Sequence, residues 1–547
     1  RNHIITMRSL IPHFGRAPLR GVAFSTAAPA TSSSYVVPPL KAKYGLWING
    51  AEEAALGGGV LSVSNPATGE HLCEVSEGTE ADVENAIAAA RDAFEDGRWS
   101  KLPPRHRAKV LNKAAELLAE NLPELARIES LATGRCLREY NAQLGRVPDW
   151  LVYHGQLASV SEGIVPPFSD ADHLCTVTRV PLGVCALVTP WNHPLLIAVK
   201  KIAPALATGN CVVVKPPELA PVTVLELGRI LKAAGLPDGV FNVVPGHGHV
   251  AGQHLCGHKG IDKVDFTGGT ATGQTIGAAC GPHVKHYCAE LGGNCPVVVF
   301  DDVSDVEEAV NGTAFGAFVA SGQTCVSAKR ILVQEGIFEE FTAMLVNKAK
   351  GLRLGDPLHP RTHMGPLISA KQLNILEKQV GKGVSEGAVV LAGGKRPLAQ
   401  QGDDEEASFD LSKGHFYEPT VLGSVVRNNY VFQEELFGPV CSVTPFKDEA
   451  HALELANDSK YGLGAAVWTS DVKVAHRMAR DVYAGVLWVN AHHRNDPSAP
   501  WGGFKESGIG RENGTDSHFE YTQAKKVVVR LAGNKEDWFG DVKARYS

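Results

Sequence analysis

The stretch GVCALVTPWNHPLLIAVKKIAPALATGNCVVVK (residues 183–215) contains two short apolar runs, GVCALV and CVVV, on either side of a longer segment. Short continuous runs rich in valine are typical of strands that are buried on both faces of a parallel sheet. The segment between them has the length of a helix and is followed by a glycine, as helices often are. The stretch therefore predicts a strand, a helix and a second strand.

The same alternation continues toward the C-terminus. Further apolar runs occur at VFNVV (residues 240–244), VDF (264–266) and PVVVF (296–300), with helical stretches between them. We therefore predict a doubly wound α/β domain. Because ligands of such sheets bind beyond the carboxyl ends of the strands, we expect TPWNHP, KPPE and FTGGTATG at one edge of the sheet.

Two helices are expected before this domain, and a second α/β series is expected after it. Thr79, followed three places later by Asp82, predicts a capped helix over residues 79–94, and Pro103 and Pro104 mark the start of another. After residue 300 further valine-rich runs alternate with amphipathic helices, which predicts a second α/β domain with Cys325 near its start.

Composition excludes several classes of protein. The chain has 547 residues and a formal net charge of −6, which gives no positive field for binding nucleic acid. Its eleven cysteines include no CxxC pair, so we expect neither a disulfide framework nor a metal site. No apolar run is long enough to span a bilayer. The sequence thus predicts a globular protein of two or three domains.

The N-terminal segment differs in composition from the rest. It contains Arg8, Arg16 and Arg20 among Ser, Thr and Ala, and the first acidic residue is Glu52. This composition is typical of a transit peptide, and a disordered tail is the alternative. We assign residues 1–42 to this segment and expect a mitochondrial matrix protein; a plastid, or the cytoplasm if the segment is not a transit peptide, are the alternatives.

One cysteine has sequence neighbours that suit a catalytic nucleophile. Cys325 lies in SGQTCVSAKR beside Gly322 and Thr324, so the backbone there can be approached closely. Inert packing is the common role of a buried cysteine. Glu290, in ELGGN, is a candidate general base that would activate water for a thiol nucleophile, although a lone Glu beside glycines is usually a turn residue.

Three further motifs lie at strand ends. Asn192 in TPWNHP offers an amide donor between two prolines. Lys215 and Glu218 in KPPE could meet ribose hydroxyls, or could form only a surface ion pair. Gly268, Gly269 and Gly273 in FTGGTATG open a helix where a pyrophosphate could bind, although the spacing is not GxGxxG and a tight turn is the alternative.

Taken together, PWNHP, KPPE, FTGGTATG, ELGGN, GQTC, EELFGPV and PWGGFKESGIGRE resemble the aldehyde dehydrogenase superfamily in order and spacing. The resemblance runs from Tyr44 to Val529. It implies an NAD(P)-dependent, non-acylating aldehyde dehydrogenase. The implied fold has a doubly wound NAD-binding domain (43–158 and 182–292), a second α/β catalytic domain (293–510) and a small β oligomerisation arm (159–181 and 520–533).

The resemblance also implies roles for individual residues. Cys325 would be the nucleophile, Glu290 the general base, and Asn192 with the Cys325 backbone N–H the oxyanion hole, while Lys201 and Glu512 would relay protons. The implied cofactor-binding residues are Thr189, Pro190, Trp191, Lys215, Glu218, Gly268, Gly269, Gly273, Leu291, Glu435 and Phe437.

The expected reaction is NAD-dependent oxidation of an aldehyde to the carboxylic acid, through a thiohemiacetal and a thioester on the cysteine. Glu218 favours NAD over NADP, because a carboxylate repels a 2′-phosphate, although NADP use stays possible. A CoA-acylating semialdehyde dehydrogenase and a catalytically silent binding protein are the alternatives; Glu290 argues against the first. We expect a homodimer or homotetramer paired through KKVVVRL (residues 525–531).

The substrate side departs from the family pattern at Lys200, where an aromatic residue is common. One hypothesis is that Lys200 faces the substrate tunnel and favours aldehydes with a carboxylate or hydroxyl tail. The alternative is a lysine on the outer face of its helix.

Overall fold

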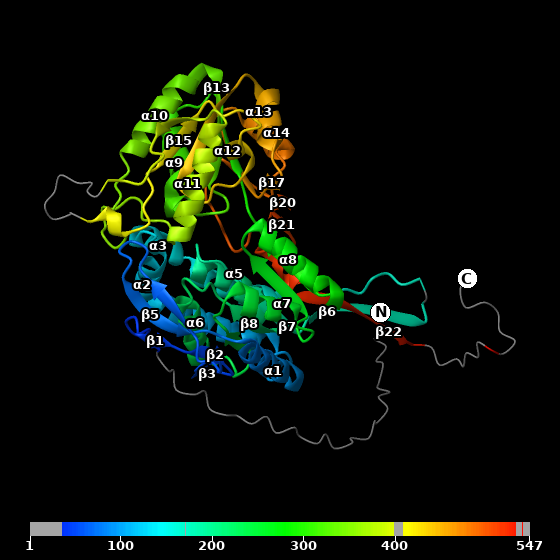
Figure 1. Ribbon diagram of the computed structural model, residues 1–547. Helices are drawn as coiled ribbons and strands as arrows, with labels where there is room; N and C mark the ends of the chain where they lie inside the picture. Colours follow the sequence, from blue (N-terminus) through cyan, green and yellow to red (C-terminus); the bar gives the residue numbers. More distant parts are fainter. Residues whose placement is uncertain (1–34, 170, 399–408, 532–538, 540–547) are drawn as a thin grey trace, which may run out of the picture. The chain divides into compact units, whose positions relative to one another are not determined.

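The computed structural model describes residues 35–169, 171–398, 409–531 and 539 (Figure 1). Most of the predicted transit segment, residues 1–34, lies outside the described residues, as does the end of the predicted arm after residue 531.

The first large sheet is built around five parallel strands in the order β11-β10-β7-β8-β9. Their bounds are β7 (Val184–Val188), β8 (Cys211–Lys215), β9 (Phe241–Val243), β10 (Lys263–Thr267) and β11 (His286–Glu290). Every residue of β7 and β8 is buried, as the valine-rich runs predicted. The strand order reverses between β7 and β10, and such a reversal opens a crevice at the carboxyl ends of the two strands.

Antiparallel strands complete this sheet at its two edges. On one side lie β2 (Leu46–Ile48) and β3 (Ala51–Glu53), and on the other lies β21 (Gly508–Ile509). β21 thus joins the first sheet, although the sequence-based division assigned residues 293–510 to the second domain. The reason is that β21 pairs with the edge of β11 through Gly508 and Ile509.

Helices accompany the first sheet, and several begin as the sequence indicates. Thr79 and Asp82 form a reciprocal capping box at α1, and Pro104 is the first residue of α2. The helices are α1 (Glu80–Asp96), α2 (Pro104–Thr133), α3 (Leu137–Leu144), α4 (Val147–Val160), α5 (Pro194–Ala207), α6 (Val222–Ala233), α7 (Gln253–Gly257), α8 (Thr270–Cys280) and α15 (Gly514–Glu520).

The second large sheet has the order β14-β15-β16-β13-β12-β18-β19, in which only β14 is antiparallel to its neighbour. The strands are β12 (Cys295–Val299), β13 (Ala328–Gln334), β14 (Val389–Ala392), β15 (Thr420–Gly423), β16 (Val440–Phe446), β18 (Gly464–Trp468) and β19 (Val486–Val489). The helices are α9 (Val306–Phe318), α10 (Phe338–Lys350), α11 (Ala370–Ser385), α12 (Tyr430–Gln433), α13 (Glu449–Asn457) and α14 (Val472–Asp481).

Smaller sheets account for the remaining strands. β6 (His173–Pro181) and β22 (Thr522–Arg530) form a two-stranded antiparallel ribbon, side by side in Figure 1. The others are β1 (Lys43–Tyr44) with β5 (His71–Ser76) and β4 (Val60–Ser64), and β17 (Tyr461–Gly462) with β20 (Phe504–Lys505). The observed architecture confirms the predicted α/β class. Within the described ranges, no helix is long and apolar enough to cross a membrane.

The two large sheets meet at the residues that carry the motifs. β11 of the first sheet ends at Glu290, and β12 of the second begins at Cys295, so only residues 291–294 separate them. The carboxyl end of the first sheet and the amino end of the second are therefore adjacent along the chain, and Cys325 precedes β13 at that same amino end.

Candidate active site

Cys325 is the one cysteine of the eleven that is not fully buried. It follows a turn in which Ala320, Ser321 and Gly322 all have left-handed backbone angles, with φ of 54°, 54° and 65°. For residues other than glycine this conformation costs on the order of 1–2 kcal/mol each, so the surrounding structure must hold it. Partial exposure on a constrained loop distinguishes this thiol from the ten packed ones.

Close backbone packing holds the cysteine loop. A Cβ on Gly293 would lie 2.1 Å from the carbonyl oxygen of Cys325, and one on Gly322 would lie 2.1 Å from that of Gly438. The buried Lys329 ammonium donates to the carbonyls of Gly322 (3.0 Å) and Gly438 (2.6 Å). The glycines of ELGGN and GQTC are therefore required by contact with neighbouring backbone.

Asn192 lies beside this loop. It follows the carboxyl end of β7 and precedes α5, and its Nδ2 donates to the carbonyl of Gln323, two residues before Cys325, at 2.9 Å. Nδ2 carries two hydrogens, so one N–H is left for another acceptor. The structure thus places an amide donor against the loop that carries the thiol.

Glu290 is buried at the end of β11, and neither carboxylate oxygen has a hydrogen-bond partner among the described residues. Burial and then the charge of Glu512 raise the pKa of Glu290 to about 8, against the opposing effect of Lys200 and Lys201. Burial, followed by the charges of Glu290 and Glu435, raises the pKa of the Cys325 thiol to about 12, while Lys200 opposes the rise. The thiol is therefore neutral in the ligand-free protein.

Lys201 and Glu512 belong to a buried charge cluster. Lys201 Nζ lies 2.6 Å from Glu512 Oε1 and also contacts Asp265 Oδ1, while Tyr521 Oη donates to Asp265 Oδ2 at 2.6 Å. Burial opposes ionisation, but Lys200 and Lys201 hold the pKa of Glu512 at about 2. Asp265 and Glu512 keep the pKa of Lys201 raised despite its burial. Lys201 and Glu512 are therefore both ionised at neutral pH.

Lys200 is part of the same cluster. Its Nζ is 2.7 Å from Glu512 Oε2 and lies 4.9 Å from the centre of the Trp501 ring, and only 5% of its side chain is exposed. The alternative of a lysine on the outer face of the helix is therefore wrong, because the Glu512 carboxylate draws the ammonium inward.

The crevice between β7 and β10 suits a nucleotide pyrophosphate. Gly269 is the N-cap residue of α8, no side chain caps this helix, and a Cβ on Gly269 would meet nothing within 4 Å. A free helix N-terminus with open space before it favours an anion. At α5, by contrast, Glu129 Oε1 accepts from the Leu195 N–H at 2.7 Å, so a carboxylate already occupies that N-terminus.

The other predicted cofactor residues lie around this edge. Thr189, Pro190 and Trp191 follow β7, and the Thr189 hydroxyl has no partner among the described residues. Lys215 ends β8 and is buried; its Nζ donates to the carbonyls of Pro216 and Gly246 and lies 3.5 Å from Glu218, whose side chain is 40% exposed. A Cβ on Gly268 would meet the Phe266 ring at 2.4 Å.

The remaining members come from α8, from the connection between the two sheets and from the segment between α12 and β16. Glu435 accepts from the Gly293 N–H at 3.1 Å, and loss of contact with water raises its pKa to about 7. The Phe437 and Trp191 rings meet edge to face with centres 5.4 Å apart. Gly273 packs α8 against Leu291, since a Cβ there would lie 2.3 Å from the leucine side chain. These residues fit a nicotinamide nucleotide held between the two sheets.

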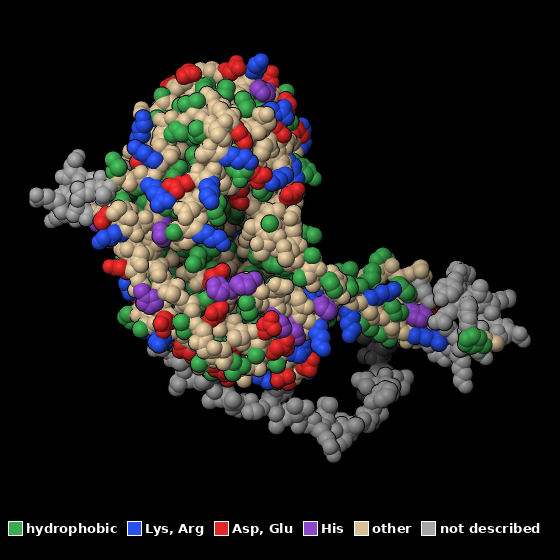
Figure 2. All heavy atoms as spheres, viewed as in Figure 1, with side chains coloured by type: hydrophobic (Ala, Val, Ile, Leu, Met, Phe, Trp, Pro, Cys, Tyr) green, Lys and Arg blue, Asp and Glu red, His purple; other side chains and the backbone are tan. Residues whose placement is uncertain are grey.

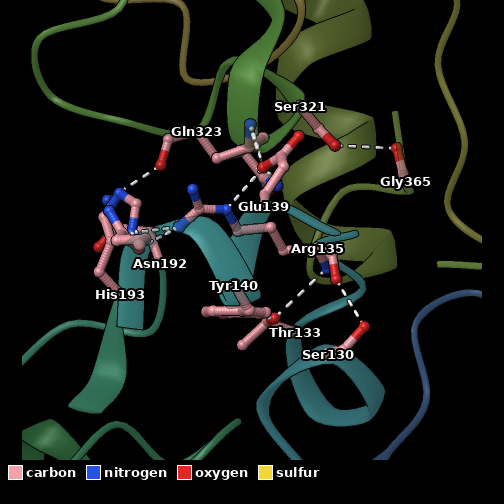
Figure 3. A network of polar contacts seen from close by, with 12 residues as sticks. Ser130, Thr133, Arg135, Glu139, Tyr140, Asn192, His193, Ser321, Gln323 and Gly365 are labelled. Carbon is pink, nitrogen blue, oxygen red and sulfur yellow. Dashed lines mark hydrogen bonds and ion pairs between the residues drawn. The ribbon is translucent and has the colours of Figure 1, made fainter. Parts of the chain in front are cut away.

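Sequence reasoning missed a second polar network beside Asn192 (Figure 3). Arg135 and Glu139 form a largely buried ion pair at 2.7 Å, and Arg135 Nη1 donates to His193 Nδ1 at 2.7 Å. Asp265 was missed as a partner of Lys201, and Tyr521 as a partner of Asp265. A carboxylate inside the apolar run VDF was the available signal for Asp265; no local pattern marks the others. Among the described side chains, no group of three or more His, Cys, Asp or Glu is arranged to hold a metal ion.

Comparison with known proteins agrees with this arrangement. The family model described as "Aldehyde dehydrogenase family" matches residues 54–527. Betaine aldehyde dehydrogenase of Bacillus subtilis is 41% identical over 90% of this chain and 98% of its own length. Aminoaldehyde dehydrogenase 2 of Zea mays is 39% identical over 90% of this chain and 97% of its own length.

Solved structures give the same result. The crystal structure of betaine aldehyde dehydrogenase from Staphylococcus aureus in complex with NAD+ superposes with a TM-score of 0.87 at 38% identity, and the match covers 91% of this chain and 96% of that one. The family and the α/β fold expected from the sequence are confirmed. This chain belongs to the aldehyde dehydrogenase family.

Proposed function

We propose that this protein oxidises an aldehyde to the carboxylic acid with NAD+, and that Cys325 is the nucleophile. The observation that carries the proposal is that the one partly exposed cysteine lies on a loop contacted by an amide donor, Asn192. Its charge neighbour Glu290 is a buried carboxyl without a hydrogen-bond partner among the described residues. A thiol, a donor and a base in one place suit acyl transfer through a thioester.

In the first half-reaction the sulfur of Cys325, after losing its proton, forms a bond to the aldehyde carbon. The carbonyl oxygen becomes an alkoxide, which the free N–H of Asn192 and the Cys325 backbone N–H would stabilise. Loss of one such donor typically costs on the order of 3 kcal/mol of barrier. The alkoxide becomes the carbonyl of the thioester when the C–H bond breaks and the hydrogen leaves as hydride. NAD+, when bound, would accept this hydride, and its positive charge would favour the thiolate.

In the second half-reaction Glu290 removes a proton from water, and the hydroxide adds to the thioester carbon. The C–S bond then breaks, which releases the carboxylic acid and returns the thiolate. A carboxyl with a pKa of about 8 has the basicity that a general base at neutral pH requires. Lys201 and Glu512, 2.6 Å apart, would carry the proton onward. Water is therefore favoured over CoA as acyl acceptor.

The cofactor-binding residues favour NAD over NADP. Glu218 is half-exposed near Lys215, so its carboxylate is available to ribose hydroxyls and would repel a 2′-phosphate. We expect kcat/KM to be higher with NAD+ than with NADP+, and expect Glu218→Gln to narrow the difference.

The substrate is proposed to be a neutral or anionic aldehyde. Relatives are named for betaine aldehyde, aminoaldehydes and phenylacetaldehyde. In this chain the charge of Lys200 acts on both Cys325 and Glu290, although Glu512, 2.7 Å from its Nζ, offsets part of it, so a substrate tail placed beside Lys200 would be favoured if neutral or anionic. Comparing kcat/KM for betaine aldehyde, propionaldehyde and succinic semialdehyde tests this, with Lys200→Met expected to improve the cationic substrate relative to the others.

We propose a homodimer or homotetramer paired along the β6–β22 ribbon. Hydrophobic side chains are exposed on this ribbon (Figure 2), among them Leu174, Val527, Val528 and Val529. Exposed apolar residues on an edge strand favour pairing with a second copy. Sedimentation of the wild type and of Val528→Lys would test it.

A mitochondrial matrix location, supported by the composition of residues 1–42, would be tested by imaging the full chain with a C-terminal fluorescent tag.

The direct test of the reaction is aldehyde-dependent NADH formation by the purified protein. Wild-type protein should reduce NAD+ in the presence of an aldehyde, and Cys325→Ala should not, although it should still bind NAD+. Full activity in Cys325→Ala would overturn the proposal, and NADH formation that needs CoA would point to the acylating alternative.

A further inference from the structure

Arg135 and Glu139 link the two loops that carry Asn192 and Cys325. Glu139 Oε2 accepts from Arg135 Nε at 2.7 Å and from the Ala320 backbone N–H at 3.0 Å. Arg135 Nη1 donates to His193 Nδ1 at 2.7 Å. Since an arginine can only donate, the ring nitrogen of His193 accepts, and the neutral imidazole carries its proton on Nε2.

These bonds close into a ring, which Figure 3 shows. From His193 it passes through Arg135 and Glu139 to Ala320, follows the backbone to Gln323, and returns because Asn192 Nδ2 donates to the Gln323 carbonyl at 2.9 Å. Asn192 and His193 are consecutive, which completes the circuit. The two loops are thus joined directly through Asn192 and indirectly through the Arg135–Glu139 pair.

The ring acts on a part of the chain that needs support. Ala320, Ser321 and Gly322 are left-handed, and such a conformation persists only where neighbours fix it. Glu139 binds the first of these residues, and the Ser321 hydroxyl donates to the Gly365 carbonyl at 2.8 Å. The side chain of Arg135 is 8% exposed and that of Glu139 13%, so solvent weakens the pair little.

The loops that carry Asn192 and Cys325 belong to different sheets, and no covalent bond between them fixes their distance. The distance between an oxyanion donor and a nucleophile nevertheless decides the rate, and a misplacement of about 1 Å can cost on the order of 100-fold. We propose that Arg135 and Glu139 are positioning residues that set the Asn192 amide relative to the Cys325 thiol. This inference rests on the proposed function, because it presumes that Asn192 stabilises the oxyanion.

The variants follow from the geometry. Arg135 Nε and the Ala320 N–H both donate to Glu139 Oε2, so a glutamine could keep both bonds through its amide oxygen, whereas Glu139→Met has no oxygen and loses both. Arg135→Met removes the contacts to both His193 and Glu139. Arg138→Gln is the matched control, since Arg138 is an exposed arginine on α3, the helix that carries Glu139. Thermal unfolding and NAD+ binding show which variants are folded.

The test is a double-mutant cycle with Asn192→Ala, measured as kcat/KM for an aldehyde and as KM for NAD+. Glu139→Met and Arg135→Met should each lower kcat/KM about 10- to 100-fold with KM for NAD+ unchanged, and Arg138→Gln should match wild type. Asn192→Ala alone should cost about 100- to 1,000-fold. Adding Glu139→Met to Asn192→Ala should cost no more than about twofold beyond it.

Losses that multiply in the double variant would overturn this inference alone, because the pair would then act independently of Asn192. A wild-type rate in Glu139→Met would also overturn it. An Asn192→Ala enzyme with wild-type kcat/KM would overturn both this inference and the proposed oxyanion hole, so the two failures are distinguishable.

Discussion

Lys200 offers a direct way to change the basicity of Glu290. The ammonium of Lys200 lies 2.7 Å from Glu512, and its positive charge lowers the pKa of the Glu290 carboxyl. Lys200→Met removes that charge but leaves Glu512 paired with Lys201 at 2.6 Å. The substitution should therefore raise the pKa of Glu290 above its value of about 8.

The size of the effect follows from the ionised fraction. With a pKa of about 8, about a tenth of Glu290 is ionised at pH 7. Removing one nearby charge at an effective dielectric constant near 20 changes the pKa by about one unit or more. The ionised fraction at pH 7 then falls to about a hundredth, so hydrolysis of the acyl-enzyme should slow about tenfold. The acid limb of its pH profile should move to higher pH by about one unit.

The assay should report hydrolysis of the acyl-enzyme alone. With 4-nitrophenyl acetate, the steady rate after the initial burst measures release of the acyl group from Cys325, where the sulfur is already bonded and its own pKa no longer matters. Glu512→Gln should shift the acid limb the opposite way, because Glu512 raises the pKa of Glu290. Lys473→Met, at an exposed lysine of α14, is the control. Unchanged acid limbs in both test variants would refute the reasoning.

Three further changes have defined outcomes. Gly293→Ala should lower kcat on the order of 100-fold in a folded protein, because its Cβ would lie 2.1 Å from the Cys325 carbonyl oxygen; a wild-type kcat would show that the loop can move aside. Gly269→Ser should lower KM for NAD+ a few-fold without loss of thermal stability, since a Cβ there meets nothing within 4 Å and a serine adds a donor at the start of α8; a raised KM would contradict it. The pKa of Glu512 lies at about 2, below its ordinary 4.5, so the ionised carboxylate stabilises the fold above pH 4.5. This contribution, on the order of 3 kcal/mol, is lost as the pH falls toward 2. In denaturant titrations, the difference in unfolding free energy between wild type and Glu512→Gln should therefore shrink over that pH range, and a constant difference would contradict the prediction.

The sequence alone was sufficient for the α/β class and for many of the elements, although not for the pairing of β21 with the first sheet. Valine-rich runs such as CVVVK became fully buried parallel strands with the expected limits, and Thr79 with Asp82 capped the helix that they predicted. These features are local: burial on both faces requires a continuous apolar run, and a capping box needs only residues three apart. The motifs lie at strand ends for the same reason, since a strand stops where its apolar run stops.

Partners across the fold could not be found in this way. Lys200 turns inward because Glu512 lies beside it, and Arg135, between α2 and α3, reaches His193, 58 positions away, only in the folded chain. The raised pKa of Glu290 likewise depends on burial and on charges brought from other elements. Residue order determines which side chains each strand and helix presents, but electrostatic and hydrogen-bond energies depend on distances in space, and only the tertiary structure decides those distances.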